Sequence, residues 1–308
     1  MRKIIGIGET ILDIIFQDNQ PQRAVPGGST FNCMVSLARC NMPVSFISEL
    51  GKDRVGEVIS DFMKENNLVT DYVCFFEEGL SPVSMAFLNE KKDAQYVFYK
   101  DFPRERLNVN FPLVKENDIV ILSSYFAVNP VLRKKVVTLL QAAKEENAII
   151  YYDINFRKPH AAERKSLMNN FMENFQYASV IRCSDEDLDI LFPNLDIDTL
   201  YSKHILPYQK TLIITRGAQS VIVKTPLLDK NYKVDPIVPV STIGAGDNFN
   251  AGFVYGLMKD EISITDLNNL PLRQWNKLIG YATMFAAEVC ASYDNYISWE
   301  FARKMKRE

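Results

Sequence analysis

Few of the residues that metal centres, catalytic triads and disulfide frameworks need occur in this chain. Its 308 residues include only two histidines, His160 and His204. That argues against a histidine-centred metal site or a Ser-His-Asp triad, although His160 alone stays a candidate functional group. The five cysteines are odd in number and lack C-x-x-C spacing, so they predict neither a disulfide framework nor a zinc site. This cysteine usage fits a reducing compartment, and we expect a cytoplasmic protein.

The chain also lacks an excess of basic residues and any long hydrophobic run. The net charge of -3 argues against binding to nucleic acid or to an anionic membrane surface, which normally requires a basic protein. No stretch approaches the roughly 18 apolar residues of a membrane span. The apolar N-terminal run is interrupted by Gly6, Glu9 and Asp13 and precedes no small-residue cleavage site. It is more typical of a buried first strand than of a signal peptide.

What the chain does contain is a regular alternation of short apolar runs and longer helix-patterned stretches. This alternation predicts an α/β protein with a doubly wound, mainly parallel sheet flanked by helices, and we expect residues 1–308 to form a single domain. The expected core strands are Ile4–Gly8, Val44–Ser48, Ile119–Leu122, Ala148–Tyr152, Ser179–Arg182 and Leu212–Thr215. The expected helices are Thr30–Arg39, Val55–Asn66, Val131–Glu146, Lys165–Phe175 and Gly246–Met258.

Two regions break this alternation and predict shorter strands. Ser84–Leu88 and Gln95–Tyr99 flank the polar turn Asn89–Ala94 and indicate an antiparallel hairpin. Ile11–Phe16 is a further candidate strand that could pair with it. We therefore predict a small β-sheet inserted at about 11–25 and 83–100. It could close over an active site as a lid, or simply pack on the rest of the protein.

The strongest local signal is the run S-T-I-G-A-G-D-N-F, from Ser241 to Phe249, which leads directly into an apolar helix. Gly244 and Gly246 permit a sharp turn and a close approach of a ligand to the backbone. Backbone N–H groups at a helix N-terminus bind anions such as a phosphoryl group. Asp247 could then accept a proton from an attacking hydroxyl. Taken alone, the run could equally be a glycine turn with Asp247 as a helix cap.

A second signal is the run P-G-G-S-T-F-N, from Pro26 to Asn32, which opens the first long helix. Paired glycines at such a junction suit a polyhydroxy ligand that lies against the backbone, and the Asn32 amide can both donate and accept hydrogen bonds. Asp13 follows the first strand, and ligands of open α/β sheets gather at the carboxyl ends of strands. Ordinary turn and cap chemistry explains the same glycines equally well.

Taken together, these motifs resemble the ribokinase-like, or phosphofructokinase-B (pfkB), family of carbohydrate kinases. The runs Gly8–Asp13, Gly27–Asn32 and Gly244–Asp247 match the family's signatures in order and spacing, and the overlap extends over nearly the whole chain. The segments Tyr152–Arg157 and Ile181–Leu188 are similar to the fructokinase branch. The resemblance implies a ribokinase-like fold with a small lid sheet. It also implies transfer of the γ-phosphoryl group of ATP to a primary hydroxyl of a sugar.

The resemblance further implies roles for individual residues. Asp247 would be the catalytic base, beside the charge-neutralising amides of Gly244, Ala245 and Gly246. The implied sugar-binding residues are Asp13, Gly27, Gly28, Asn32, Phe98, Lys100 and Arg157, of which Arg157 reaches either substrate or phosphate. The implied nucleotide-binding residues are Ser184, Asp187, Thr215 and Gly217, with Mg²⁺ held near Asp187. A helix cap at Ser184 and an ordinary strand exit at Thr215 are the alternative interpretations.

Four positions depart from the family's pattern, and one of them is Ser220, which stands where a second glycine often ends the T-x-G-x-x-G segment. Ser241 stands where an aspartate usually helps to shape a monovalent-cation site, which counts against activation by potassium. Asp187 is one methylene shorter than the usual glutamate. Lys100 stands where fructokinases commonly have arginine, and the two are not interchangeable in bidentate contacts. The change at Lys100 weakens a specific fructose assignment. Fructose is still the first candidate substrate, because Tyr152–Arg157 resembles the fructokinase motif, while ribose, 2-keto-3-deoxygluconate and nucleosides stay open.

Other functions were weighed against this one. A dinucleotide oxidoreductase would need glycine or alanine where Ile11 stands, and a P-loop phosphotransferase would need a G-x-x-x-x-G-K-[ST] run that the chain lacks. A non-catalytic sugar or nucleotide sensor on the same fold is the remaining alternative, against which Asp247 beside intact glycines argues. We expect a sugar and ATP as partners, with no nucleic acid and no membrane. An exposed edge of the lid sheet would favour a homodimer.

Overall fold

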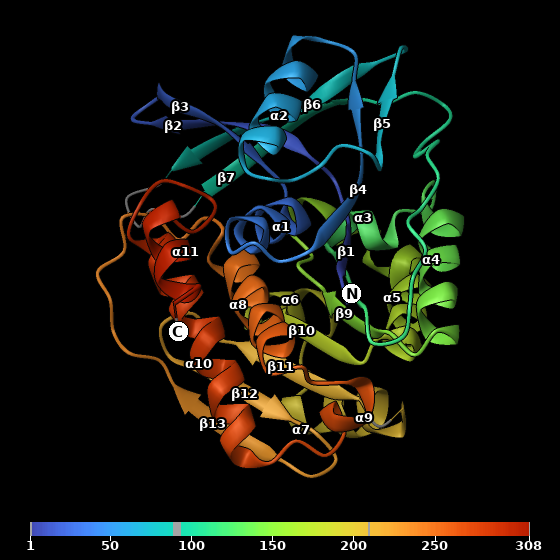
Figure 1. Cartoon of the computed structure of the whole chain (residues 1–308), viewed down its shortest axis with the longest axis vertical. Coiled ribbons are helices and arrows are strands. Elements are labelled where there is room, and N and C mark those ends of the chain that lie inside the picture. The colour runs from blue at the N-terminus through green and yellow to red at the C-terminus, as the bar shows by residue number, and fades with distance from the viewer. Residues whose placement is uncertain (1, 89–93, 209, 308) are drawn as a thin grey trace.

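The computed structural model describes residues 2–88, 94–208 and 210–307, which form a large sheet between helices and a second, smaller sheet (Figure 1). The large sheet has nine strands within these residues. Their order is β13 (Asp229–Lys233), β12 (Ser220–Lys224), β11 (Thr211–Thr215), β10 (Val180–Ser184), β9 (Ile149–Asp153), β8 (Ile119–Ser123), β1 (Ile4–Ile7), β4 (Val44–Gly51) and β5 (Val73–Phe76). The strands from β11 to β5 are parallel, and β12 and β13 extend the sheet as antiparallel strands.

Helices cover both faces of this sheet, which explains why its strands are apolar throughout. In β9, Tyr151 packs into one hydrophobic core and Tyr152 into the other. The first core includes residues of α1 (Ser29–Arg39), α2 (Arg54–Glu65), α8 (Ala245–Lys259), α9 (Ile264–Leu267), α10 (Leu272–Cys290) and α11 (Trp299–Met305). The second includes residues of α3 (Ser124–Val128), α4 (Arg133–Glu145), α5 (Arg164–Tyr177), α6 (Asp185–Leu191) and α7 (Ile197–Leu200). Short 3₁₀ or π turns span Lys158–Glu163, Tyr201–Ile205 and Leu206–Tyr208.

The smaller sheet confirms the predicted inserted strands. Its order is β3 (Gln20–Gly27), β2 (Ile11–Gln17), β6 (Leu80–Leu88) and β7 (Ala94–Asp101). Strands β6 and β7 form the expected antiparallel hairpin, and β2 pairs parallel with β6 and antiparallel with β3. The turn predicted at Asn89–Ala94 falls largely on residues 89–93, which lie outside the described residues. The sheet lies beside α2 at the top of Figure 1, away from β13.

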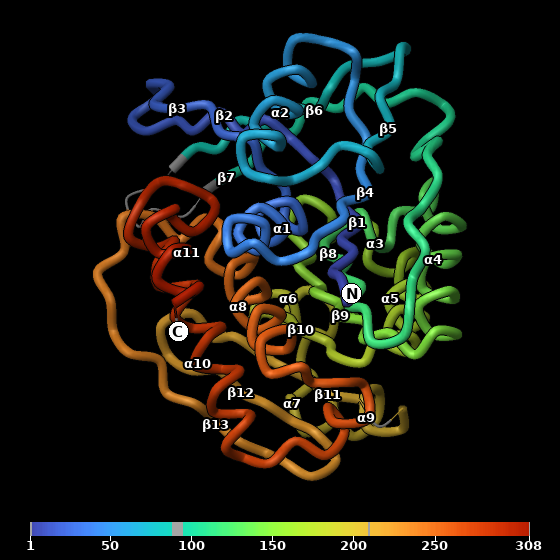
Figure 2. Tube along the Cα trace, viewed as in Figure 1, coloured from blue at the N-terminus to red at the C-terminus, as the bar shows by residue number. Residues whose placement is uncertain are grey.

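The order of the large sheet creates a place for a ligand. The chain runs from β1 to β4 and β5 on one side and from β8 to β11 on the other, so the winding direction reverses between β1 and β8. Open α/β sheets bind ligands outside the carboxyl ends of strands at such a switch point. There, Thr30 Oγ1 of α1 lies 2.7 Å from Ser123 Oγ at the end of β8. Helix α8, far along the chain, packs against α1 (Figure 2).

Several elements are not among those expected from the sequence. The strand β13 is polar in sequence and alternates between exposed and half-buried residues, so no apolar run marks it. The long helix α10 contacts α8 at small residues, including Gly252, where an added Cβ would overlap the Tyr281 carbonyl. No helix among the described residues has the length and apolar character that crossing a membrane requires.

Candidate active site

Asp247 lies in the first turn of α8, at the end of a tight glycine turn. Gly244 adopts a left-handed conformation with φ of 77°, and an added Cβ there would lie 2.8 Å from the Asn295 carbonyl oxygen. Glycine is therefore required at this position. The Ala245 N–H already donates to a carbonyl within the turn at 3.3 Å. The Gly246 and Asp247 amides follow in the first turn, where a helix provides no acceptors of its own.

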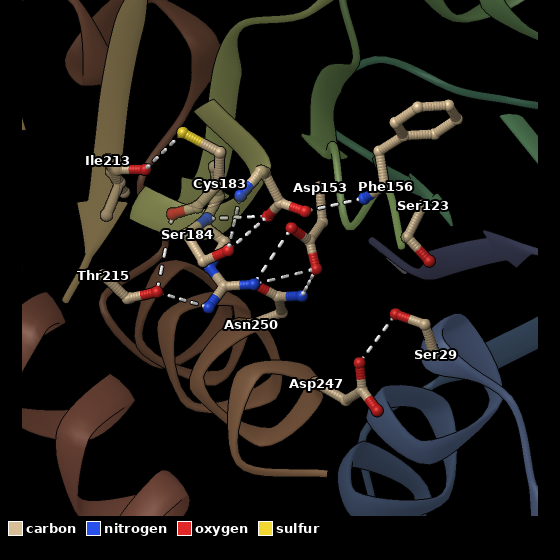
Figure 3. A network of polar contacts seen from close by, with 12 residues as sticks. Ser29, Ser123, Asp153, Phe156, Cys183, Ser184, Ile213, Thr215, Asp247 and Asn250 are labelled. Atoms are coloured by element: carbon tan, nitrogen blue, oxygen red, sulfur yellow. Dashed lines mark hydrogen bonds and ion pairs between the residues drawn. The ribbon is translucent and has the colours of Figure 1, made fainter. Parts of the chain in front are cut away.

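Two neutral donors from α1 hold the Asp247 carboxylate. Ser29 Oγ donates to Oδ1 at 2.6 Å (Figure 3), and Asn32 Nδ2 donates to Oδ2 at 2.8 Å. The residue is only 7% exposed, and it has no ion pair with any described residue. Burial raises the pKa of Asp247, while these hydrogen bonds and the charges of Arg157 and Arg182 oppose the shift. A carboxylate with a raised pKa is a better proton acceptor.

A second buried carboxylate, Asp13 of β2, lies close to the first. It accepts hydrogen bonds from Ser84 Oγ and, at 3.5 Å, from Asn295 Nδ2. Burial raises the pKa of Asp13 to about 7, and the charge of Asp247 contributes to the rise. An added Cβ on Gly27 would overlap the Asp13 carboxylate. A side chain at position 27 would thus fill the space beside this carboxylate.

Gly28 lies at the junction between β3 and α1, where the backbone conformation favours glycine. Gly28 has φ of 127°, and an added Cβ would overlap the Glu9 carbonyl oxygen. One turn later, Asn32 uses its Nδ2 on Asp247, while its Oδ1 is buried without a hydrogen-bond partner among the described residues. The chain therefore leaves an acceptor open at this point, and buried polar atoms normally have a partner.

The predicted sugar contacts of β7 reach across to the end of β1. Lys100 Nζ lies 2.7 Å from Glu9 Oε2 and 4.9 Å from the centre of the Phe98 ring. Tyr96 stacks on Phe98 with ring centres 5.7 Å apart. Burial raises the pKa of the Tyr96 phenol, and the charges of Asp13 and Asp247 raise it further. Tyr96 thus lies within electrostatic reach of both carboxylates.

Arg157 follows β9 and is exposed. Its side chain forms no hydrogen bond or ion pair with a described residue, and its charge acts to lower the pKa of Asp247. A free guanidinium this close to the carboxylates is suited to an anionic group, since its fork of N–H donors matches phosphate or carboxylate oxygens.

Ser184 and Asp187 form a capping box at the start of α6. The Asp187 N–H donates to Ser184 Oγ at 3.1 Å, and the Ser184 N–H donates to Asp187 Oδ2 at 2.8 Å. Asp187 Oδ1 accepts from the Phe156 N–H at 2.7 Å. The Asp187 carboxylate therefore joins the loop after β9 to the end of β10. The contacts that Ser184 and Asp187 make within the protein are those of a helix cap.

Arg182 of β10 is the centre of a buried network that was not predicted. Figure 3 labels three residues of this network, Asp153, Thr215 and Asn250. Its Nη1 donates to Asp153 Oδ1 at 3.0 Å and its Nη2 to Thr215 Oγ1 at 2.6 Å, while Asn250 Nδ2 donates to Asp153 Oδ2 at 2.7 Å. An added Cβ on Gly246 would lie 3.0 Å from the guanidinium nitrogens. Burial lowers the pKa of Arg182, but the charges of Asp153, Tyr151 and Asp187 and the hydrogen bond to Asp153 together raise it by more, so the guanidinium stays charged. This charge lies directly against the start of α8.

The remaining predicted nucleotide contact, Gly217, lies just beyond β11. It has φ of 54°, and no atom outside its neighbours lies within 4 Å of an added Cβ. The backbone there borders open space.

The described residues include no group of three or more acidic, histidine or cysteine side chains that could hold a metal ion. A Mg²⁺ ion that enters with a nucleotide typically takes its ligands from phosphates, water and one or two carboxylates. Asp187 fits that donor set, since Oδ1 accepts a single hydrogen bond, from Phe156. Its contact with metal stays a prediction.

The structure thus brings the predicted sugar and catalytic residues together near the carboxyl ends of β1 and β3 and the first turn of α1, against the start of α8. Ser184, Asp187, Thr215 and Gly217 lie on the neighbouring strand ends of β10 and β11. The residues that contact the predicted ones but were not predicted include Ser29, Ser84, Tyr96, Arg182 and Asn295. Ser29 stands inside the G-G-S run and Tyr96 lies two positions from Phe98, so both could have been predicted from neighbouring motifs. Nothing in the sequence marks Asn295.

The comparison with known proteins covers almost the whole chain. A family model described as pfkB family carbohydrate kinase matches residues 1–299. The probable fructokinase-6, chloroplastic, of Arabidopsis thaliana is 25% identical over 296 residues, which cover 92% of this chain and 75% of that protein. The probable fructokinase-3 of the same plant is 23% identical over 277 residues, covering 85% of this chain and 80% of that protein.

Solved structures share the fold over nearly their full length. A fructokinase from Vibrio cholerae O395, in a form with bound fructose, ADP and calcium ion, superposes with a TM-score of 0.82 at 19% identity and covers 99% of each chain. Aminoimidazole riboside kinase from Salmonella enterica, complexed with aminoimidazole riboside and an ATP analog, gives a TM-score of 0.79 at 18% identity, again with 99% of each chain covered. The α/β fold with a lid sheet is thereby confirmed as ribokinase-like. Since the family model spans residues 1–299, the protein belongs to the pfkB family of carbohydrate kinases and is a phosphotransferase.

Proposed function

We propose that this carbohydrate kinase transfers the γ-phosphoryl group of ATP to a primary hydroxyl of a sugar, with Asp247 as the base. The observation that carries the proposal is the 2.8 Å hydrogen bond from Asn32 Nδ2 to Asp247 Oδ2. It joins a residue with an open acceptor for a hydroxyl to a carboxylate at the positive end of α8. A hydroxyl bound beside Asn32 would therefore meet a proton acceptor and an anion-binding helix end together.

The chemistry follows from these positions. As the sugar oxygen forms its bond to the γ-phosphorus, its proton passes to Asp247, and the bond to the β-phosphate oxygen breaks to release ADP. The amides of Gly246 and Asp247 and the buried charge of Arg182 would stabilise the negative charge that develops. Mg²⁺ held by the nucleotide phosphates and Asp187 would supply further charge neutralisation.

A sugar would be held on the opposite side of Asp247. Asp13 can accept hydrogen bonds from sugar hydroxyls, and Asn32 can accept one through Oδ1. The smaller sheet would act as a lid, because Lys100 of β7 already reaches Glu9 at the end of β1. Closing a site in this way excludes water from the transferred phosphoryl group.

Fructose is the first candidate substrate. The segment Tyr152–Arg157 resembles the fructokinase motif, and several relatives carry the name fructokinase. A nucleoside is the second candidate, because the fold is shared with a kinase crystallised with aminoimidazole riboside. Ribose and 2-keto-3-deoxygluconate complete the set, since a few hydroxyl partners decide specificity in such pockets.

A non-catalytic sensor on this fold explains the site less well. Burying a carboxylate without a cationic partner is costly, yet within the described residues the Asp247 side chain accepts hydrogen bonds from Ser29 and Asn32 and forms no ion pair. A sensor has no need for a carboxylate buried at this place. A catalytic base does, because burial raises the pKa of Asp247 and makes it a better proton acceptor.

The test is an assay of ADP release with fructose, ribose, 2-keto-3-deoxygluconate and nucleosides in the presence of ATP and Mg²⁺. We expect sugar-dependent ADP release for at least one compound and its loss in the Asp247→Asn variant. Undiminished release in that variant would contradict the base assignment. Sugar binding by calorimetry without any ADP release would support the sensor.

We also propose that the enzyme does not depend on potassium. Ser241 Oγ accepts a hydrogen bond from the Ile243 N–H at 3.2 Å, so this neutral side chain is turned into its own loop. Replacing potassium by a large organic cation in the same assay should leave the rate within about twofold, whereas a loss of activity would count against the proposal.

A further inference from the structure

The loop between α10 and α11 brings a residue into the sugar side of the site that no motif indicated. Asn295 lies in this loop and is 1% exposed. Its backbone carbonyl accepts a hydrogen bond from Asn248 Nδ2 at 2.8 Å and lies against Gly244. The loop is therefore fixed to the turn that opens α8, and the position of the Asn295 side chain is set by that anchor.

The Asn295 side chain lies between two residues that we expect to bind sugar. Its Nδ2 approaches Asp13 Oδ2 at 3.5 Å. An added Cβ on Gly27 would lie 3.2 Å from the same nitrogen. The amide thus lines the space that Gly27 leaves open beside the Asp13 carboxylate.

The other end of this amide has no partner. Asn295 Oδ1 is buried without a hydrogen bond from any described residue, as is Oδ1 of Asn32. In both residues the amide nitrogen faces a carboxylate, Asp13 for Asn295 and Asp247 for Asn32. Because an ionised carboxylate accepts and does not donate, Asp247 and the ionised form of Asp13 fix which way each amide points and leave each carbonyl oxygen free. A buried acceptor left unpaired is unfavourable, so a ligand donor at these oxygens would be stabilising.

We propose that Asn295 determines sugar specificity, with its Oδ1 accepting a hydrogen bond from a substrate hydroxyl other than the one that is phosphorylated. Asn32 lies beside Asp247 and would hold the reacting end of the sugar. Asn295 lies beside Asp13 and holds a second hydroxyl. This inference rests on the proposed function, because it assigns one more contact to the same substrate.

The first experiment compares Asn295→Ala with the wild-type enzyme on the best sugar from the panel. We expect the KM for the sugar to rise about tenfold or more, with the KM for ATP within about twofold, since one buried hydrogen bond to the sugar is lost. Asn174→Ala is the matched control. Asn174 is also buried, and its Oδ1 accepts from Arg133 on the opposite face of the large sheet. An unchanged sugar KM in folded Asn295→Ala, or equal increases in both KM values, would overturn the proposal.

The second experiment uses monodeoxy analogues of that sugar, each with one hydroxyl replaced by hydrogen. One analogue should bind the wild-type enzyme about tenfold more weakly and lose almost nothing further in Asn295→Ala, because the contact is already absent. If, for every analogue, the loss of affinity caused by the missing hydroxyl and the loss caused by Asn295→Ala multiply, the two are independent and Asn295 binds none of these hydroxyls. Asn295→Ser keeps a polar side chain and serves if the alanine variant does not fold.

These outcomes are separable from failure of the proposed function. If the wild-type protein phosphorylates no sugar, the proposed function fails. Calorimetry with fructose and ribose would then compare the wild-type protein with the Asn295 variants directly. A tenfold loss of sugar affinity in the variant supports the Asn295 contact, and equal affinities reject it.

Discussion

Two sets of buried carboxylates lie at the same edge of the large sheet, and their surroundings differ. Asp153 is fully buried and has a cationic partner, Arg182, together with the amide of Asn250. Asp13 and Asp247 are nearly as buried, but their hydrogen-bond donors are neutral. Asp153 is therefore ion-paired, although Arg182 Nε is buried without a hydrogen-bond partner among the described residues, whereas Asp13 and Asp247 form no ion pair within them.

This difference separates structural from functional burial. A buried charge is tolerated when a counter-ion and hydrogen bonds replace the water it has lost. Asp13 and Asp247 form no ion pair in the part of the chain that the structure describes, and the charge of Asp247 contributes to the raised pKa of Asp13. Perturbed carboxylates of this kind collect at functional sites. We therefore expect substitutions in the two sets to have opposite effects on stability and on activity.

The largest effect is expected for Asp247→Asn. Removing the base should lower kcat by about 10²–10⁴-fold, the usual contribution of general base catalysis. Since asparagine has the same shape and no charge, the free energy of unfolding should stay the same or rise. Steady-state kinetics and urea denaturation test both parts. A destabilised variant with near-normal kcat would place Asp247 with the structural carboxylates instead.

The next effect concerns Arg182→Met, which leaves Asp153 buried without a counter-ion. Breaking one side of a buried ion pair should lower the free energy of unfolding by about 3–5 kcal/mol. The control is Lys64→Met, which breaks the exposed pair with Asp61 and should cost less than about 1 kcal/mol. Equal losses in urea denaturation would contradict the structural role of the Asp153 network.

Asp13→Asn should act on sugar affinity and on its pH dependence. The wild-type kcat/KM for the sugar should rise as the pH passes through about 7, because Asp13 must lose its proton to accept hydrogen bonds from hydroxyls. In the variant this part of the pH profile should disappear, and the sugar KM should be about 10–100-fold higher.

The stability of the wild-type protein should change with pH in the opposite sense. The pKa of Asp13 is higher in the folded state than in the unfolded state, so the carboxyl stabilises the fold at low pH and loses this contribution as the pH rises through about 7. Asp13→Asn should flatten that dependence in thermal unfolding between about pH 4 and 7, the window between the ordinary pKa of 3.8 and the raised pKa of about 7. An identical slope in both proteins would show that Asp13 is ionised throughout.

The smallest effect is expected for Ser184→Ala, which removes the cap of α6. It should lower the free energy of unfolding by about 1 kcal/mol and raise the KM for ATP, since Ser184 positions Asp187. Ser263→Ala is the matched control, because Ser263 forms the same capping box with Asp266 on α9. If the KM for ATP were equal in both variants, Ser184 and Asp187 would have no role in ATP binding and would serve only to cap α6.

Local patterns predicted the parts of the site that are contiguous in sequence. The G-A-G-D run placed Asp247 in the first helical turn because the glycines, the carboxylate and the apolar helix follow one another directly. The G-G-S run likewise placed Asn32 one turn into α1. The apolar strands were predicted because burial on both faces removes polar residues from them.

Contacts between distant segments could not be predicted in this way. Arg182 looks in sequence like one more residue of a strand, and only the packing of α8 on the sheet brings Gly246 against it. Asn295 follows α10 in a loop whose composition gives no indication of Asp13, 282 positions away. Ser184 and Asp187 showed the opposite case, where a local capping pattern was correctly considered as an alternative.

The loop that carries Asn295 contacts the candidate active site in two places. Its main chain supports Gly244, and its side chain faces Asp13. A displacement of even about 1 Å can be costly for a transfer reaction, so an insertion or exchange here disturbs two neighbourhoods at once. Evolution toward a new sugar through this segment is therefore constrained. Laboratory evolution of substrate range should start from β6 and β7, which, within the described residues, do not contact the glycine turn at Gly244.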